Sequence, residues 1–149
     1  MSFDTSMVAA MLNMRLLAFV RQHGLGWLAQ SDGGLQIFPD APSKVRFADG
    51  VFIAKARAPR RPIDGHLRVV PDLVIEVVSP NDNAEDVETK ISEYLGAGVK
   101  LIWVVYPETR SVHVVRPSGV GSRLSHADTL SGEDVVSGFE LPIAEIFDF

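Results

Sequence analysis

The spacing of apolar residues along the chain predicts a succession of short helices and strands. Over residues 5–22, apolar side chains recur every three or four positions, which predicts a helix that ends at Gly24. Shorter apolar runs follow, separated by loops that contain glycine or proline. We expect strands at 34–38, at 45–54 with Gly50 as a candidate bulge, at 111–116 and around 123–124, and a short closing helix near 142–147.

The middle of the chain has the clearest pattern. The segments 72–78 and 100–106 are almost continuously apolar, which is typical of buried central strands. Between them, residues 82–96 carry an apolar stripe at helical spacing, and Asp82 with Glu85 resembles a capping box. Short links between the three elements predict a right-handed strand–helix–strand crossover.

These elements predict one α/β (α+β) domain over residues 1–149, with a mixed β-sheet flanked by helices. A length of 149 residues with 46% hydrophobic residues suits one core. The absence of cysteine excludes disulfides and thiolate metal sites and favours a cytoplasmic protein. No uninterrupted apolar run approaches the ~20 residues of a membrane span, and no basic region precedes the apolar N-terminal part. We therefore expect neither a membrane partner nor a signal peptide.

Charge narrows the candidate partners. The net charge of −5 argues against a protein that coats nucleic acid non-specifically. One segment, 54–70, nevertheless has five basic residues against the single acid Asp64, which leaves a local charge of five minus one, or +4. It is either a solvated loop or a loop that contacts phosphates. Its basic residues are Lys55, Arg57, Arg60, Arg61 and Arg68.

Glu76 is the residue that needs a chemical explanation. An ionised carboxylate in a buried strand is costly unless it is paired or bound to a metal. Asp72 faces the same side of the predicted strand, but four residues at ~3.3 Å each put it ~13 Å away. Asp49, in a separate strand-like segment, is the better partner because neighbouring strands lie ~4.8 Å apart.

Two such carboxylates suit Mg²⁺, which prefers oxygen ligands and retains several waters. Such an ion can activate a water and neutralise the charge that develops on a phosphate. Lys90 adjoins the apolar stripe of the predicted helix, so its stem can lie along apolar surface and bring its ammonium over the sheet. The sequence therefore suggests a metal-dependent phosphodiesterase site formed by Asp49, Glu76 and Lys90.

Simpler interpretations stay open for each residue. Glu76 could pair with Arg46 or Arg68, and Asp49 could belong to an Asp-Gly turn. Lys90 could form an exposed bridge to Asp86. The secondary candidates could have structural roles only. Asp72 could accept backbone hydrogen bonds at the start of its strand, and Ser79 could belong to a loop.

Three motifs together resemble a known family. They are PDLVIEVVSP at 71–80, the spacing D-x-x-x-K-x-x-x-Y-x-x-x-G-V at 86–99, and LIWVVYPETR at 101–110. This combination is similar to the Uma2 family (DUF820), which is counted among the endonucleases of the PD-(D/E)xK, restriction-endonuclease-like superfamily. SGEDVVSGFELPIAEIF, at 131–147, also fits.

The resemblance implies a role for each site residue. Asp49 matches the first metal-binding acid and Glu76 the second. Val78 occupies the usual position of the motif lysine, and Lys90 matches the lysine that this family carries on the following helix. Superfamily members hydrolyse nucleic-acid phosphodiesters with Mg²⁺ (or Mn²⁺), and such folds often act as dimers. We therefore expect a nucleic-acid substrate, DNA rather than RNA, and a homodimer.

The chain also departs from the family pattern. Family members usually begin with a segment resembling Y-E-L-I-D-G-E-L, and we expect this chain to lack it. Thr5 or Ser6 stands where a histidine is common in the family, and Ala48 replaces a proline before Asp49. These departures motivate a second hypothesis, a catalytically weakened nucleic-acid-binding or protein-interaction module of the same fold.

Overall fold

The computed structural model describes residues 2–30, 32–62, 64–119 and 121–149. Its helices are α1 (Phe3–His23), α2 (Ala84–Ala97) and α3 (Ile143–Phe147). Its strands are β1 (Gly26–Gln30), β2 (Gly34–Leu35), β3 (Arg46–Phe47), β4 (Gly50–Ala54), β5 (Leu73–Val77), β6 (Leu101–Tyr106), β7 (Ser111–Val115), β8 (Ser122–Leu124), β9 (Thr129–Ser131) and β10 (Glu140–Pro142). The large sheet has the strand order β1-β4-β5-β6-β7-β8, and β2–β3 and β9–β10 form two small sheets.

The large sheet is mixed, as predicted. β5 and β6 run parallel, in register from Leu73↔Leu101 to Val77↔Val105, and α2 connects them. The other neighbouring strands of this sheet pair antiparallel. The expected strand–helix–strand unit is therefore present at the centre of the fold.

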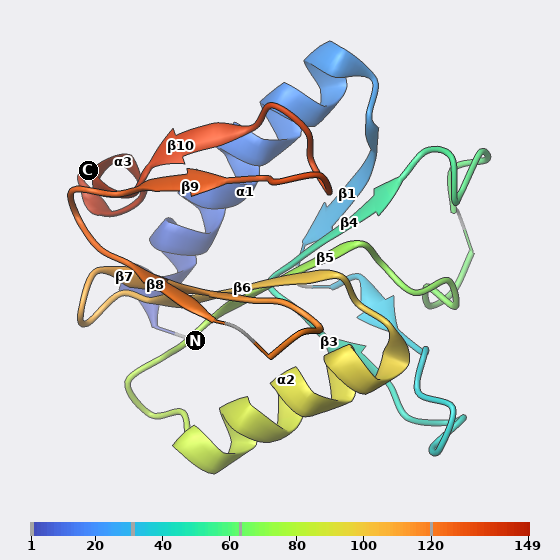
Figure 1. Ribbon diagram of the computed structural model, residues 1–149. Coiled ribbons are helices and arrows are strands. Elements are labelled where there is room, and N and C mark those ends of the chain that lie inside the picture. The colour runs from blue at the N-terminus through green and yellow to red at the C-terminus, as the bar shows by residue number, and fades with distance from the viewer. Residues whose placement is uncertain (1, 31, 63, 120) are drawn as a thin grey trace.

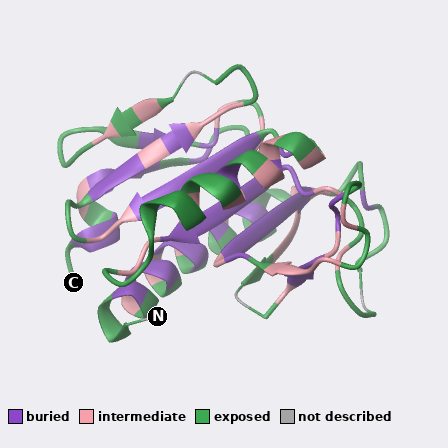
Figure 2. Cartoon of the chain, turned by 90° about the horizontal axis from the view of Figure 1, so that it is seen from below, coloured by how far each residue is buried: buried purple, intermediate pink, exposed green. Residues whose placement is uncertain are grey.

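Helices cover both faces of this sheet (Figures 1 and 2). α1 and α3 pack on one face, and α2 packs on the other. Because side chains alternate along a strand, Ile75 of β5 joins the core beneath α1, whereas Val74 joins the core beneath α2. Glu76 points to the same side as Val74, where it contacts Tyr94 of α2.

Capping residues account for the helix ends. Ser2 caps α1 by accepting the Thr5 N–H, and Gly24 ends α1 in the left-handed region at φ 60°. Asn83 caps α2 by accepting the Glu85 N–H, so the predicted Asp82 capping box is wrong. Asp82 instead accepts the N–H of Ser79 and stabilises the preceding turn.

α1 is apolar on more than its buried side. Its inner face, which includes Val8, Leu12 and Leu16, lies in the core. Among the described residues, α1 alone is long and apolar enough to cross a membrane by length and composition, a test that core helices also pass.

The region before β5 differs most from the prediction. The expected strand at 45–54 breaks at Ala48 and Asp49, because β3 pairs with β2 whereas β4 joins the large sheet. The strand expected at 34–38 is confined to Gly34–Leu35. β1 was not predicted, because this edge strand is half-exposed and lacks a clear alternation. Gly50 pairs regularly with Ile75 and forms no bulge.

Asp72 fastens the start of β5 to its neighbours. It is only 3% exposed, and its Oδ2 accepts the Ala54 N–H at 2.8 Å. Its Oδ1 lies 3.1 Å from Arg57 Nη1 and 3.3 Å from Lys100 Nζ. One hydrogen bond and two cations therefore compensate this buried carboxylate.

Asp72→Ala should lower the free energy of unfolding by about 2–4 kcal/mol, because it leaves the Ala54 N–H and the Arg57 guanidinium without their partner. Urea denaturation measures the change. Asp148→Ala, which removes an exposed ion pair with Arg110, is the control and should cost less than about 1 kcal/mol. Equal losses in the two variants would contradict a stabilising role for Asp72.

Candidate active site

Asp49 and Glu76 lie side by side at one end of the large sheet. Gly50 pairs with Ile75 in the antiparallel β4–β5 register, so Asp49 stands opposite Glu76. The Asp49 N–H donates to the Ile75 carbonyl at 2.9 Å, and Asp49 Oδ2 accepts the Val77 N–H at 2.6 Å. The Asp49 carboxylate is thus held against β5, and the interpretation of Asp49 as part of a hairpin turn is wrong.

The backbone at Asp49 is also held from α1. Asn13 Nδ2 donates to the Asp49 carbonyl at 2.9 Å. A Cβ atom at Gly50 would lie 2.5 Å from Asn13 Oδ1 and 2.9 Å from Ile75 Cδ1. A larger residue would therefore require the Asn13 and Ile75 side chains to shift, so glycine favours the close approach of α1 and β5 just after Asp49.

Helix α2 supplies the partners of Glu76. Tyr94 donates its hydroxyl proton to Glu76 Oε1 at 2.6 Å, and Lys90 Nζ lies 3.8 Å from Glu76 Oε2. Lys90 and Tyr94 are four residues apart, so they lie one above the other on the same side of α2. Lys90 accordingly pairs with Glu76, and neither Arg46 nor Arg68 forms an ion pair with this acid among the described residues.

Burial perturbs both carboxylates. Glu76 is 7% exposed, and desolvation raises its pKa from 4.5 to about 7 despite the opposing effects of the Tyr94 hydrogen bond and Lys90. Desolvation also raises the pKa of Asp49, against the Val77 N–H and Lys90. The negative charge of Asp49 adds to the rise at Glu76. The two acids therefore carry more negative charge than their surroundings compensate.

This pair of acids fits a divalent cation that prefers oxygen. Each carboxylate has one oxygen occupied by a strong hydrogen bond, Asp49 Oδ2 and Glu76 Oε1, which leaves the second oxygen for a ligand. In the described part of the chain no group of three or more histidine, aspartate or glutamate side chains is arranged to hold a metal. Two carboxylates with several waters is the donor set that Mg²⁺ commonly adopts, whereas zinc sites use more protein ligands.

A cavity of about 420 Å³ lies next to Lys90, the cationic partner of Glu76, and its described lining residues do not include either carboxylate of the pair. Lys90 and Arg46 supply its cationic groups, and Asp82 and Asp86 its acidic ones. The remaining lining residues are Asn81, Asn83, Val87 and Thr89. Arg46 belongs to β3, and its Nε donates to Glu93 Oε2 at 2.8 Å.

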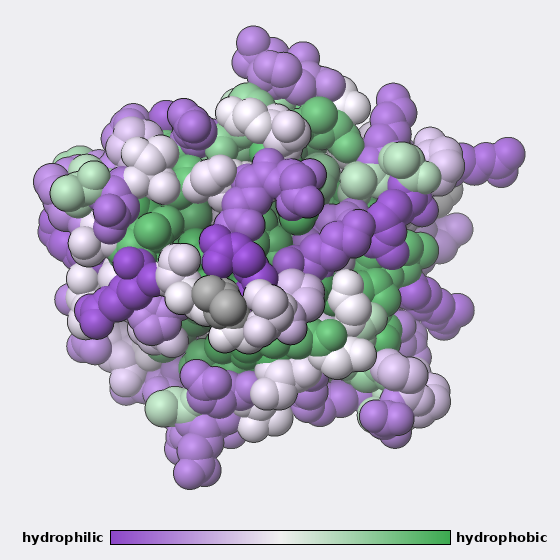
Figure 3. Space-filling view, in the orientation of Figure 1, coloured by the Kyte–Doolittle hydropathy of each residue, from purple (hydrophilic) through white to green (hydrophobic). Residues whose placement is uncertain are grey.

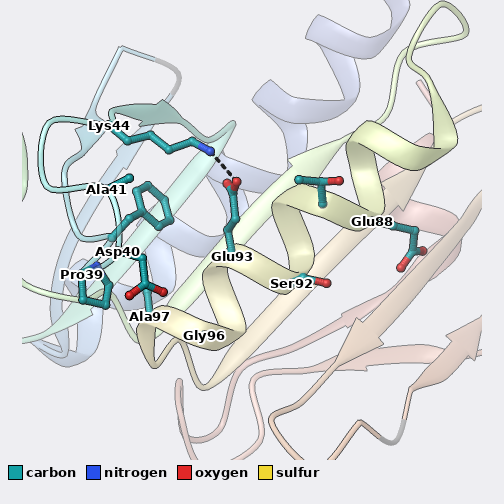
Figure 4. A pocket seen from close by; sticks show the side chains of 11 residues that line it. Pro39, Asp40, Ala41, Lys44, Glu88, Ser92, Glu93, Gly96 and Ala97 are labelled. Atoms are coloured by element: carbon teal, nitrogen blue, oxygen red, sulfur yellow. Dashed lines mark hydrogen bonds and ion pairs between the residues drawn. The ribbon is translucent and has the colours of Figure 1, made fainter.

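A second cavity, of about 510 Å³, continues along α2 and shares Thr89 with the first. Figure 4 shows it between the C-terminal half of α2 and the loop that carries Pro39, Asp40 and Ala41. Lys44 reaches across its mouth to Glu93. The two cavities form a trough along α2 that is bounded by Lys44 and Arg46.

The other predicted site residues are not brought to the acid pair. The connection 55–72 leaves β4 and enters β5 at the end of the sheet opposite the start of α2 (Figure 1). Asp72 belongs to that end and binds Arg57 and Lys100, so its secondary candidacy is not supported. The basic residues of this connection are all exposed: Lys55, Arg57, Arg60, Arg61 and Arg68.

Part of this basic connection nevertheless folds back toward the site. Leu67 forms a parallel bridge with Leu35 of β2, and the His66 ring lies 6.0 Å from the Phe47 ring. Phe47 follows Arg46 in β3. A continuous surface thus leads from the cavity beside Lys90, across β3, to the segment that precedes Arg68.

Ser79 lies just beyond the carboxyl end of β5. Its Oγ is 3.4 Å from Thr5 Oγ1, and its N–H donates to Asp82. Ser79 therefore joins the start of α1 to the loop beside the site, and it makes no hydrogen bond to either carboxylate among the described residues. Thr5 is one of the two residues, with Ser6, at which the family resemblance led us to expect a histidine.

Comparison with known proteins identifies the family and agrees with the fold. The profile of the Uma2 family, described as "Putative restriction endonuclease", matches residues 1–144. The chain belongs to the Uma2 family. No curated protein matches it. A solved structure of a putative nuclease belonging to DUF820, from Anabaena variabilis ATCC 29413, superposes with a TM-score of 0.86 at 19% identity, covering 99% of this chain and 82% of the other.

Three residues beside the acids of this Uma2 protein were not predicted as parts of its site. Tyr94 belongs to the apolar stripe predicted over residues 82–96 and is buried, but its hydroxyl also orients Glu76. Its position four residues after Lys90, on the same side of the predicted helix, was the feature of the sequence that could have placed it at the site. Asn13 and Arg46 approach from α1 and β3, and sequence spacing does not relate those elements to β5.

Glu76→Gln should stabilise the protein above neutral pH. Between pH 4.5 and about 7 the folded wild type retains a proton on Glu76 that the unfolded chain has lost, so its free energy of unfolding falls as pH rises. The full loss is roughly 3 kcal/mol. We expect the variant to match wild type near pH 4 and to exceed it by up to about 3 kcal/mol near pH 8.

Urea denaturation across this pH range, in buffer without divalent ions, measures the difference. Glu108→Gln, in an exposed turn, is the control and should stay within about 0.5 kcal/mol of wild type throughout. A pH-independent difference between Glu76→Gln and wild type would refute a raised Glu76 pKa.

Proposed function

We propose that this chain is a divalent-cation-dependent endonuclease that hydrolyses nucleic-acid phosphodiester bonds. The observation that carries the proposal is the pair of neighbouring carboxylates, half-buried Asp49 and buried Glu76, with the Lys90 ammonium 3.8 Å from Glu76 and a cavity that Lys90 lines. Membership of the Uma2 family supports the same class of activity.

Asp49 and Glu76 would hold Mg²⁺ or Mn²⁺ through their available oxygens. When bound, the ion lowers the pKa of a water and neutralises charge on a phosphate. Tyr94 restrains Glu76 by holding Oε1, which directs Oε2 toward the cation site and Lys90. Asn13 restrains the backbone of Asp49.

Lys90 is the group that acts on the reacting atoms. Its ammonium can hold the attacking water in place and stabilise the negative charge that develops on the phosphate oxygens. The Lys90 stem lies beside the apolar contacts of α2, which limits its freedom. Arg46 lines the same cavity and offers a second cation to the phosphate.

Calorimetric titration of the wild type with Mn²⁺ at pH 8 should give a binding heat. The same titration of Glu76→Ala should give none. Because a proton competes for Glu76 below pH 7, the affinity at pH 6 should be about tenfold lower than at pH 8. Lys90→Met should still bind Mn²⁺ at pH 8 but cleave DNA about 10²–10³-fold more slowly, as expected for loss of a group that stabilises developing charge.

Arg123→Met, which removes an exposed cation on the edge strand β8, is the control and should cleave at the wild-type rate. A wild type that binds no divalent ion would rule out the enzyme. A wild type that binds the ion and nucleic acid but cuts neither DNA nor RNA would favour the second hypothesis, a binding module of the same fold.

The nucleic acid would extend from the cavity across β3 to the basic connection. Asp72 and Glu76, near the two ends of β5, are four residues or ~13 Å apart along the strand, a length that a duplex spans in about four base pairs. Arg57 is occupied by Asp72, so Lys55, Arg60, Arg61 and Arg68 are the side chains of this connection that can reach phosphates. We infer DNA as the substrate and this surface as its path.

The double variant Arg60→Ala/Arg68→Ala should weaken DNA binding at low salt and reduce the slope of log affinity against log salt by about two. Fluorescence anisotropy with a labelled duplex measures both quantities. Arg46→Ala, beside the acid pair, should lower cleavage more than affinity. Wild-type affinity and slope in the double variant would exclude the basic connection from the interface.

A further inference from the structure

The outward face of α1 is apolar over most of the helix. Phe3, Met7, Ala10, Met14 and Leu17 follow one another at intervals of four, three, four and three residues, so they form one stripe along α1. Phe3 is 83% exposed, Met14 57% and Leu17 40%. On the face drawn in Figure 3, by contrast, apolar areas are broken by hydrophilic side chains. A continuous exposed apolar stripe indicates a surface that another molecule covers.

The stripe is complementary to itself. Its members are nearly symmetric about Ala10, so in an antiparallel pair with a two-fold axis at Ala10, Phe3 of one copy opposes Leu17 of the other. Met7 then opposes Met14, and the small side chain of Ala10 lets the helices approach closely. A two-fold interface requires this reciprocity of contacts.

Charge follows the same symmetry. Asp4 and Arg15 lie on one flank of the stripe, eleven residues apart, at about equal distances from Ala10. Arg15 Nη1 lies 2.9 Å from Glu145 Oε1 of its own chain, and in the antiparallel pair the Asp4 carboxylate of the other copy would approach the same guanidinium. A membrane-binding helix, by contrast, is typically flanked by several lysine or arginine residues.

The two-fold symmetry would bring Phe3, the most exposed side chain of the stripe, to a cavity on the other copy. The cavity has a volume of about 590 Å³, and Leu17 and Arg21 of α1 line it together with Trp27, Leu28 and Ala29 of β1. Phe3 of a second copy, opposite Leu17, would reach this cavity. An aromatic side chain that fills a pocket on its partner is a common anchor of protein interfaces.

We propose that α1 is the homodimer interface of this protein, with a second copy packed antiparallel on the stripe and Phe3 of each copy inserted beside Leu17 of the other. The interface does not depend on the proposed nuclease chemistry. α2 and the acid pair lie on the opposite face of the sheet, so both candidate active sites remain accessible in the dimer.

The absence of cysteine allows a direct test by cross-linking. Ala10→Cys places one thiol per copy at the two-fold axis and should give a disulfide-linked dimer on mild oxidation. Phe47→Cys, at an exposed position on β3, is the matched control and should remain uncross-linked. Equal cross-linking of both variants, or none of Ala10→Cys, would overturn the proposed interface.

Sedimentation equilibrium without metal or nucleic acid tests the same interface separately from catalysis. Wild type should sediment as a dimer at micromolar concentration. Phe3→Ala and Met14→Glu, both at exposed positions, should raise the dimer dissociation constant at least tenfold, whereas Phe47→Ala should leave it unchanged. A monomeric wild type, or a monomer that binds phosphatidylglycerol vesicles through α1, would overturn the proposal.

Discussion

The burial of two neighbouring carboxylates at one end of the sheet is the constraint on which the rest of the site depends. Glu76 is placed in a strand that is buried on both faces, and Asp49 is held against the same strand by the Val77 N–H. Desolvation then raises the pKa of both acids. Gly50 allows β4 to begin immediately after Asp49, because any side chain there would meet Asn13 and Ile75. α2 completes the arrangement by bringing Lys90 and Tyr94 over Glu76.

The part of the fold that could be predicted is the part whose pattern is local. β5, α2 and β6 are recognisable because each has one periodicity throughout and the links between them are short. The segment 45–54 was predicted as one strand because its apolar alternation does not reveal which partner each half has. The break at Asp49 comes from tertiary pairing, with β3 bonded to β2 and β4 bonded to β1 and β5. β1 was missed because it is a half-exposed edge strand without a clear alternation of apolar and polar residues.

The same difference between local patterns and tertiary contacts decides which residues of the candidate site could be predicted. Glu76 is conspicuous because a charge interrupts a buried strand, and Lys90 follows from the stripe of α2. Asp49 was associated with Glu76 because it lies in a strand-like segment, and the family resemblance supported that choice. Nothing between residues 49 and 76 specifies the register of the two strands. Tyr94 and Asn13 were missed because their polar contacts are made across layers of the fold. The basic connection was identified by composition, but its position at the other end of the strands depends on the direction of β4 and β5.

Two acids of the same segment show what distinguishes a structural carboxylate from a candidate ligand. Asp72 is as buried as Glu76, and it has a backbone N–H, a guanidinium and an ammonium around it. Glu76 has one hydroxyl, one ammonium at 3.8 Å and a second carboxylate beside it. Arg46 contributes a small lowering of the Glu76 pKa from a distance, but its ion pair is with Glu93. An acid that only stabilised the fold would gain from such a partner, so the uncompensated charge of the Asp49–Glu76 pair is itself the argument for a bound cation.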